Sequence, residues 1–363
     1  MCRVPRLSSS RQNLTCFVAC LLTASVLLFQ LHLHWDSSFN CARQQSVTAI
    51  VRPAGWKLGH TIVSSKGVAA PLPSEPEQSG PTRFPKLIHQ TVKNKTQLSC
   101  QQRKVIASWR SLNPGYSHRL WDDADIQRFM QQFYPELVPS PFNDFVSGAE
   151  RSDLWRVLVL HKLGGVYADM DVQCLKPIDE WNADHGHDAA VLLGVENYDA
   201  GRQHPLHVVN WVLAAAPGHA LLGSMPGIVA RAVQRQFFQL ARSAGAVLHG
   251  PAYTDGIIDR TGPAALSWAA YEYLNNTVGV NMGTATYSNV TSPAGLLAGG
   301  VRLLPIEQMG SGWEVAEARK TGRNFTCDDL AREKPTALVC HMFWGSWRDS
   351  WSFGQQQTYG EEC

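Results

Sequence analysis

The segment formed by residues 149–171 constrains the fold more than any other part of the 363-residue sequence. It starts with a helical pattern over residues 149–163, in which apolar side chains recur on one face. A Gly-Gly pair at positions 164–165 follows, and glycine commonly ends a helix. The next residues, 166–168, are apolar and lead directly into two aspartates. A helix, a glycine stop and a short buried strand in this order predict an α/β fold with polar groups at the carboxyl end of a strand.

Strand and helix patterns also alternate before and after this segment. An open α/β sheet accounts for the alternation, and ligands of such sheets bind outside the carboxyl ends of the strands. At roughly 150 residues per domain, the chain length fits either two domains or one large domain with a tail. The expected strands lie at residues 86–90, 116–121, 166–168 and 189–195, and the expected helices lie at residues 105–112, from 122 onward and at 149–163.

The N-terminal region contains an apolar run at residues 14–34 without a formal charge. About 20 helical residues span the hydrocarbon core of a bilayer, so this run predicts a transmembrane signal anchor. Residues 1–13 contain arginines, which places this short tail in the cytosol and the bulk of the chain in the lumen. A cleaved signal peptide is the alternative, but the length of the run and the lack of a small-x-small cleavage site favour the anchor. The expected topology is single-pass type II, in the membrane of the Golgi or the endoplasmic reticulum.

Residues 35–83 lack sustained periodicity and become rich in Pro, Ser and Gly near their end, which is typical of a stem or linker. Residues 84–363 are therefore expected to form the folded luminal domain. The luminal part of the chain has six cysteines, which permits disulfides without fixing their pairing. The 32 basic and 30 acidic residues are too balanced for nucleic acid to be the main partner. The 12 tryptophans fit core packing or a carbohydrate-facing surface.

Asp169 and Asp171 follow the strand at residues 166–168 with one residue between them. Side chains two residues apart in an extended segment point to the same side, so both carboxylates can face one cation. Carboxylate oxygens suit Mg²⁺ or Mn²⁺, and such a metal stabilises the charge that builds on a departing phosphate. A lone Asp-x-Asp triplet is more often a solvated loop. The preceding Gly-Gly-Val-Tyr sequence is what favours a catalytic metal site here.

Three further side chains have two interpretations each. Asp153 and Arg156 share one helix face, so they form either an exposed ion pair or a pair that faces a cleft and binds sugar hydroxyls and phosphate. His341 is either a buried structural histidine or a third metal ligand, and neutral imidazole suits Mn²⁺ better than Mg²⁺. The candidate catalytic residues are Asp153, Arg156, Asp169 and Asp171, and the candidate metal ligands are Asp169, Asp171 and His341.

The block at residues 149–156, continued by residues 164–171, resembles the core of the DXD-containing glycosyltransferases of family 32. This family includes the fungal initiation-specific α-1,6-mannosyltransferases and the inositol-phosphorylceramide mannosyltransferases. The agreement extends in order over residues 84–351 and is closer to the initiating enzymes in several stretches. The further matching stretches are residues 84–91, 113–116, 120–123, 210–211, 216–219, 259–263 and 341–347.

This resemblance implies a GT-A-type open mixed sheet, a Rossmann-like nucleotide-binding core with helices on both faces. It also implies a nucleotide-diphosphate sugar, Mn²⁺ or Mg²⁺, and retention of the anomeric configuration. Asp169 and Asp171 would contact the metal and the ribose, and Asp153 and Arg156 the donor sugar. The implied contacts to the nucleotide sugar come from His89, Gln90, Asp153, Arg156, Tyr167, Asp169, Ser346 and Trp347.

The expected activity is transfer of mannose from GDP-mannose to a luminal N-glycan, with the acceptor hydroxyl attacking the face from which GDP leaves. Val92 and Arg260 stand where this family often has tryptophan, which leaves the substrates open but not the reaction class. Asp255 and Asp259 are either acceptor contacts or loop caps. Two alternatives stay open. One is transfer to inositol phosphorylceramide or another glycolipid, and the other is a catalytically inactive, sugar-binding homologue.

Overall fold

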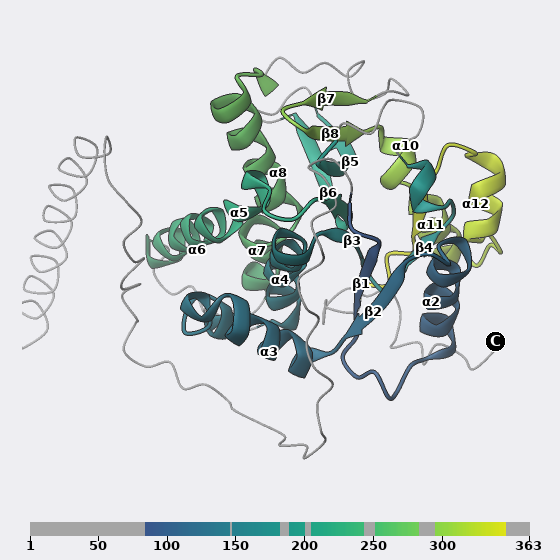
Figure 1. Cartoon of the computed structure of the whole chain (residues 1–363), viewed down its shortest axis with the longest axis horizontal. Coiled ribbons are helices and arrows are strands. Elements are labelled where there is room, and N and C mark those ends of the chain that lie inside the picture. The colour runs from purple at the N-terminus through teal and green to yellow at the C-terminus, as the bar shows by residue number, and fades with distance from the viewer. Residues whose placement is uncertain are drawn as a thin grey trace, which may run out of the picture. The chain divides into compact units, whose positions relative to one another are not determined.

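A mixed sheet of seven strands lies at the centre of the computed structural model (Figure 1). The structure describes residues 84–145, 147–181, 189–199, 205–242, 251–282 and 295–345. The strand order is β2-β1-β3-β6-β5-β8-β7; β6 and β7 run antiparallel to the other five strands. The strands are β1 (Leu87–Thr91), β2 (Ser117–Trp121), β3 (Gly165–Ala168), β5 (Val191–Tyr198), β6 (Leu206–Ala215), β7 (Leu296–Ala298) and β8 (Val301–Leu304).

Helices cover both faces of this sheet, with α4, α6 and α8 on one side and α2, α11 and α12 on the other (Figure 1). Short 3-10 turns lie at Pro135–Leu137, Phe142–Asp144 and Ile178–Glu180, and a π-helical turn lies at Tyr273–Val278. The helices are α2 (Cys100–Leu112), α3 (Asp123–Phe133), α4 (Gly148–Leu163), α5 (Ala220–Gly223), α6 (Met225–Arg242), α7 (Pro251–Arg260), α8 (Pro263–Glu272), α10 (Ile306–Met309), α11 (Trp313–Lys320) and α12 (Cys327–Glu333).

The two faces of the sheet bury separate sets of apolar side chains. In β3, Tyr167 packs in the core that includes Trp155 of α4, whereas Val166 and Ala168 pack in the core that includes Trp109 of α2. Successive side chains of a strand point to opposite faces, so a strand buried on both sides reads as continuously apolar. The predicted α/β class, with a large mixed sheet and helices on both faces, is confirmed for the described residues.

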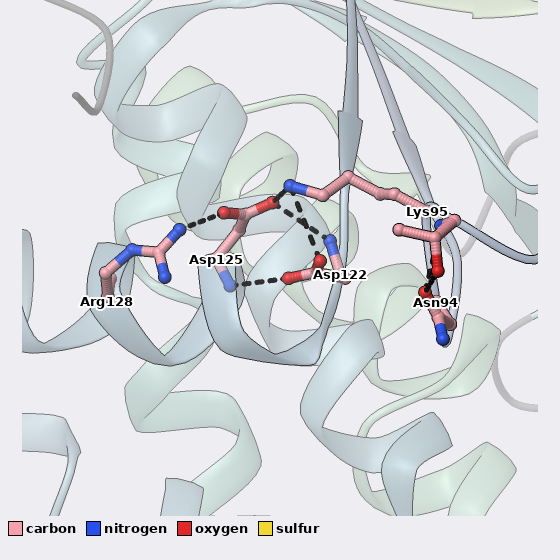
Figure 2. Close-up of polar contacts among 6 residues, drawn as sticks. Asn94, Lys95, Asp122, Asp125 and Arg128 are labelled. Atoms are coloured by element: carbon pink, nitrogen blue, oxygen red, sulfur yellow. Dashed lines mark hydrogen bonds and ion pairs between the residues drawn. The ribbon is translucent and has the colours of Figure 1, made fainter. Parts of the chain in front are cut away.

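Capping residues explain where the early helices begin. Helix α2 starts at Cys100, earlier than the predicted residue 105, because Ser99 and Gln102 form a reciprocal capping box that the apolar pattern alone does not reveal. Helix α3 starts after Asp122, whose carboxylate accepts a hydrogen bond from the Asp125 amide. Figure 2 shows how this helix start is tied to the loop after β1, since Lys95 pairs with both of these aspartates.

A second, small sheet brings the C-terminal region to the end of β3. Strand β4 (Val172–Cys174) pairs antiparallel with β9 (Val339–His341), and the register sets Val172 opposite His341. A disulfide between Cys327 and Cys340 links β9 to α12, a pairing that the sequence had left open. His341 therefore lies next to the aspartates although about 170 residues separate them along the chain.

The predicted membrane anchor at residues 14–34 and the stem at residues 35–83 lie outside the described residues and stay predictions. Within the ranges that the structure describes, no helix combines the length and the hydropathy needed to cross a bilayer. All described residues belong to one compact unit, residues 66–363.

Gly165 at the start of β3 has a φ of +99°, and a Cβ atom there would lie 2.5 Å from the carbonyl oxygen of Leu87 in β1. Alanine would push these paired strands apart, so we expect Gly165→Ala to lower the free energy of unfolding by about 3 kcal/mol. Gly218→Ala is the matched control: its φ is also positive, +75°, but an added Cβ would meet no atom within 4 Å. The control should cost about 1 kcal/mol. Chemical unfolding of the full chain, followed by tryptophan fluorescence, measures both; equal losses would contradict the close approach.

Candidate active site

A buried guanidinium joins α4 to the end of β3. Arg156 Nη2 lies 3.0 Å from Asp153 Oδ1 and 3.2 Å from Asp169 Oδ1, and its Nη1 donates to the carbonyl oxygen of Asn210 at 2.8 Å. Asp153 and Arg156 are only 7% and 6% exposed, so the alternative of a surface ion pair is excluded. Arg156 instead links Asp153 to the Asp-x-Asp segment, and the predicted contacts of this pair to a sugar and a phosphate stay predictions.

Asp153 is held by two more donors besides Arg156. The side-chain amide of Asn210 donates to Asp153 Oδ1, and the Thr261 hydroxyl donates to Asp153 Oδ2, each at 3.0 Å. Burial raises the pKa of this carboxyl to about 6, and the negative charge of Asp169 adds to the rise, whereas Arg156 opposes it. Asp153 is therefore a fixed, buried group whose proton affinity is far above that of an exposed aspartate.

Asp169 is the most accessible carboxylate of this group, with 24% of its side chain exposed. The Tyr167 hydroxyl donates to its Oδ1 at 2.5 Å, and the Tyr167 ring lies 4.9 Å from the Arg156 guanidinium carbon. Burial raises the pKa of Asp169, and nearby Asp171 adds to this rise against the opposing charge of Arg156. An accessible carboxylate beside a second acid can bind a cation or accept a hydrogen bond from a ligand.

Asp171 binds the C-terminal segment. His341 Nε2 lies 3.3 Å from Asp171 Oδ2, and the backbone amide of Trp344 donates to the same oxygen at 2.9 Å. Burial acts to raise the pKa of Asp171, but His341 and this amide outweigh burial and lower it. The His341 ring is stacked on Trp211 of β6 with centroids 4.4 Å apart. The negative charge of Asp171 is thereby stabilised at the point where two sheets meet.

His89 and Gln90 lie beneath the site, and the structure offers neither side chain to a ligand. His89 is fully buried; its Nε2 donates to the Gly164 carbonyl oxygen at 3.0 Å and its Nδ1 accepts from Trp121 at 3.2 Å. Burial lowers the pKa of His89 to about 3, so the ring is neutral. Gln90 is also fully buried and donates to the Asp169 carbonyl oxygen at 3.2 Å. In this structure His89 supports the Gly-Gly turn and Gln90 supports Asp169, and their predicted contacts to a nucleotide stay predictions.

The predicted set of three metal ligands is not assembled in this form. Among the described residues, no three His, Cys, Asp or Glu side chains are grouped so that they could hold a metal ion. The physical reason is that His341 is bonded to Asp171, while the nearest cation to Asp169 is Arg156. Two further predicted ligand contacts, Ser346 and Trp347, lie outside the described residues.

Several residues of the site were not assigned a role from the sequence. Asn210 and Thr261 fall in stretches that resemble the family, but only the fold shows that both bind Asp153. Glu196 near the end of β5 is partly buried; burial raises its pKa and His341 opposes the rise, which places this acid near the histidine. No spacing in the sequence links Glu196 to the other acids.

Arg260, which stands where the family often has tryptophan, forms an ion pair in the core. Arg260 Nε donates to Glu150 Oε1 at 2.8 Å, and both side chains are buried, at 3% and 0% exposed. This pair fastens α7 to the first turn of α4, directly beside the Thr261 hydroxyl that binds Asp153. Asp259 is exposed on α7, and the side chain of Asp255 lies outside the described residues, so their roles stay predictions.

Residues 99–187 match the family described as glycosyltransferase sugar-binding region containing DXD motif. The matched segment contains Asp153, Arg156, Asp169 and Asp171. The resemblance to DXD-containing glycosyltransferases that the sequence predicts is therefore confirmed over this segment, which is about a quarter of the chain.

The chain is also similar to fungal mannosyltransferases. It is 27% identical over 281 residues to the initiation-specific alpha-1,6-mannosyltransferase of Schizosaccharomyces pombe. The aligned region covers 73% of this chain and 64% of that protein. It is 30% identical over 198 residues to inositol phosphoceramide mannosyltransferase 3 of the same organism. This aligned region covers 53% of this chain and 46% of that protein. The chain thus spans less than two thirds of the length of either relative. Among solved structures, the PaToxG glycosyltransferase is 17% identical with a TM-score of 0.36 and covers 52% of this chain and 69% of that chain.

The raised pKa of Asp153 predicts a pH-dependent stability. The folded state binds this proton more tightly than an unfolded aspartate with a pKa near 3.8. The contribution to stability is therefore complete below about pH 4, is lost as the pH rises through about 6, and amounts to about 3 kcal/mol. Asp153→Asn is neutral at every pH, so this slope should disappear from its unfolding free energies between pH 4 and 7. Asp328→Asn, which removes an exposed carboxylate, is the control. An unchanged slope in Asp153→Asn would contradict the burial argument.

Proposed function

We propose that the chain is a metal-dependent, retaining mannosyltransferase with a GT-A fold that uses GDP-mannose and a luminal N-glycan acceptor. The observation that carries the proposal is the buried Arg156, which connects Asp153 of α4 to Asp169 after β3. This arrangement places a fixed cation and accessible acid oxygens together outside the carboxyl end of a strand, where sheets of this class bind ligands. The names of the similar fungal enzymes support mannose as the sugar.

The charges of the site fit a bound divalent cation. Three carboxylates, of Asp153, Asp169 and Asp171, surround the single guanidinium of Arg156, which leaves an excess of negative charge when all are ionised. A pyrophosphate is itself anionic, so it needs a further cation to bind there. Mg²⁺ and Mn²⁺ are held by one or two carboxylates together with substrate phosphates, and Asp169 and Asp171 supply such oxygens. The metal would act as a Lewis acid on the pyrophosphate.

The side chains of the site would orient the donor for a front-face reaction. Arg156 and Asp153 would bind the transferred hexose, with Asn210 and Thr261 keeping the Asp153 carboxylate in place. The bond between the anomeric carbon and the phosphate oxygen breaks, and an acceptor hydroxyl forms the new bond on the same face. Its proton passes to the departing phosphate oxygen, so no protein nucleophile is required. The protein contributes mainly by positioning and by fixed charges.

Transfer to a glycolipid is the second candidate function. It is favoured by the similarity to inositol phosphoceramide mannosyltransferase 3 of Schizosaccharomyces pombe. The proposed type II anchor at residues 14–34, in the Golgi or the endoplasmic reticulum, would keep either acceptor within reach. An inactive homologue would have no need of the buried Arg156 network, because ion pairs of this kind carry a large desolvation cost.

A panel of nucleotide sugars tests the donor. The purified full chain should hydrolyse GDP-mannose with Mn²⁺ and lose this activity when a chelator is added. The rates with GDP-mannose, UDP-glucose and UDP-N-acetylglucosamine are compared by measuring the released nucleotide. A preference for a UDP-sugar would overturn the mannosyl proposal and leave the reaction class intact. Absence of hydrolysis with every donor would overturn both.

Asp171→Asn keeps the shape of the side chain but removes its charge. We expect a loss in kcat/KM of about 100-fold or more, because several kcal/mol of charge stabilisation at the pyrophosphate would disappear. Asp328→Asn, on the exposed face of α12, should leave the rate unchanged. Both rates are measured across a Mn²⁺ titration. If the Asp171→Asn variant keeps the wild-type rate and metal dependence, this acid does not belong to the catalytic centre.

A further inference from the structure

Trp313 is a large aromatic side chain that the fold leaves at the surface. It is the first residue of α11 and is 48% exposed, and the only other large hydrophobic side chain exposed in the described ranges is Leu297, at 40%. An indole exposes a wide apolar face at an energetic cost unless something covers it. Its position, next to the site, indicates what that partner is.

Aromatic contacts connect Trp313 to the catalytic acids. The ring of Phe343 lies edge-on to Trp313 with centroids 5.5 Å apart, and it lies 3.9 Å from the His341 ring. His341 in turn binds Asp171 at 3.3 Å. The row of contacts therefore runs from the surface to Asp171, whereas the contact with Arg156 is made by the other acid of the segment, Asp169.

The backbone holds this row in place. Gly312 has a φ of +130°, and a Cβ atom there would lie 2.0 Å from the carbonyl oxygen of His341, so the loop before Trp313 rests directly on β9. The His341 amide donates to the Ser311 carbonyl oxygen at 3.0 Å. Phe343 has a φ of +48°, a left-handed conformation that costs a non-glycine residue energy and persists only where its surroundings impose it. Such strain is typical of ligand-binding segments.

Polar groups border the exposed indole. Lys320 Nζ lies over one face of the Trp313 ring, 4.6 Å from its centre, and is paired with Glu317 at 2.6 Å, which leaves the opposite face for a ligand. A pyranose ring has one apolar face of C–H groups and a rim of hydroxyls. An indole beside an ammonium and a carboxylate matches both features, because the ring packs against the C–H face and the charged groups bond the hydroxyls.

We infer that Trp313 stacks on a hexose of the acceptor glycan and so aligns the attacking hydroxyl with the donor sugar. This inference rests on the proposed function and adds the acceptor subsite to it. The donor hexose is assigned to Arg156 and Asp153, which lie on the Asp169 side of the segment and outside the aromatic row, so Trp313 remains for the acceptor. Two ring contacts, Trp313–Phe343 and Phe343–His341, separate the proposed acceptor subsite from Asp171, so the indole can be removed without removing a partner of that acid.

The test separates donor chemistry from acceptor binding in the full chain. Trp313→Ala should leave the hydrolysis of GDP-mannose unchanged while the KM for a soluble high-mannose oligosaccharide rises about tenfold, the usual worth of one aromatic stacking contact. Trp313→Phe should restore most of the affinity, because it keeps a ring. Leu297→Ala removes the other exposed apolar side chain and should change neither value. Unchanged hydrolysis also shows that each variant is folded.

The measurements distinguish a failure of the proposed function from a failure of the stacking role of Trp313. If the wild-type chain hydrolyses no nucleotide sugar, the proposed function fails before the acceptor is considered. If the wild-type chain transfers sugar and Trp313→Ala keeps the wild-type KM for the oligosaccharide, the stacking role is overturned. If Trp313→Ala weakens transfer only to a glycolipid in phosphatidylcholine vesicles, the indole contacts the lipid surface, which also overturns the acceptor-sugar assignment.

Discussion

The buried charge of Arg156 is the constraint on which the rest of the site depends. A guanidinium inside a protein costs several kcal/mol in lost hydration, and only well-placed partners offset this cost. Here the partners come from three elements: Asp153 on the same helix, Asp169 after β3, and the Asn210 carbonyl oxygen of β6. These two carboxylates keep the guanidinium charged and raise its pKa despite burial. Moving any one of the three elements would remove a partner from this buried charge.

The antiparallel β6 makes this arrangement possible. It lies between β3 and β5. There the backbone carbonyl oxygen of Asn210 accepts a hydrogen bond from Arg156, and the side-chain amide of Asn210 donates one to Asp153. Trp211, the next residue, stacks on His341. One strand thus contacts both the α4 half of the site and the C-terminal half.

The local elements around the site could be predicted from the sequence, and its long-range contacts could not. The apolar pattern before Gly164 predicted helix α4 within one residue, and the Gly-Gly stop located β3. The i, i+3 spacing of Asp153 and Arg156 says only that both share a helix face. Their burial against Asp169 follows from sheet order, as does the bond between His341 and Asp171. The predicted three-ligand metal set shows the same limit: residue type identifies possible ligands, but the fold decides which partner each one meets, and here His341 contacts Asp171 while Asp169 contacts Arg156.

The two proposed substrates would meet on opposite sides of a segment with little freedom. Asp169 is fixed by Tyr167 and Gln90 on the side of the main sheet, and Asp171 is fixed by His341 and the Trp344 amide on the side of the small one. A front-face reaction needs the acceptor hydroxyl within bonding distance of the anomeric carbon while the phosphate is leaving, and small misplacements cost orders of magnitude in rate. The contacts that fix both acids, together with the aromatic row that reaches Asp171 through His341, would reduce that error. The catalytic power of such a site would come from groups that are already in place before either substrate binds.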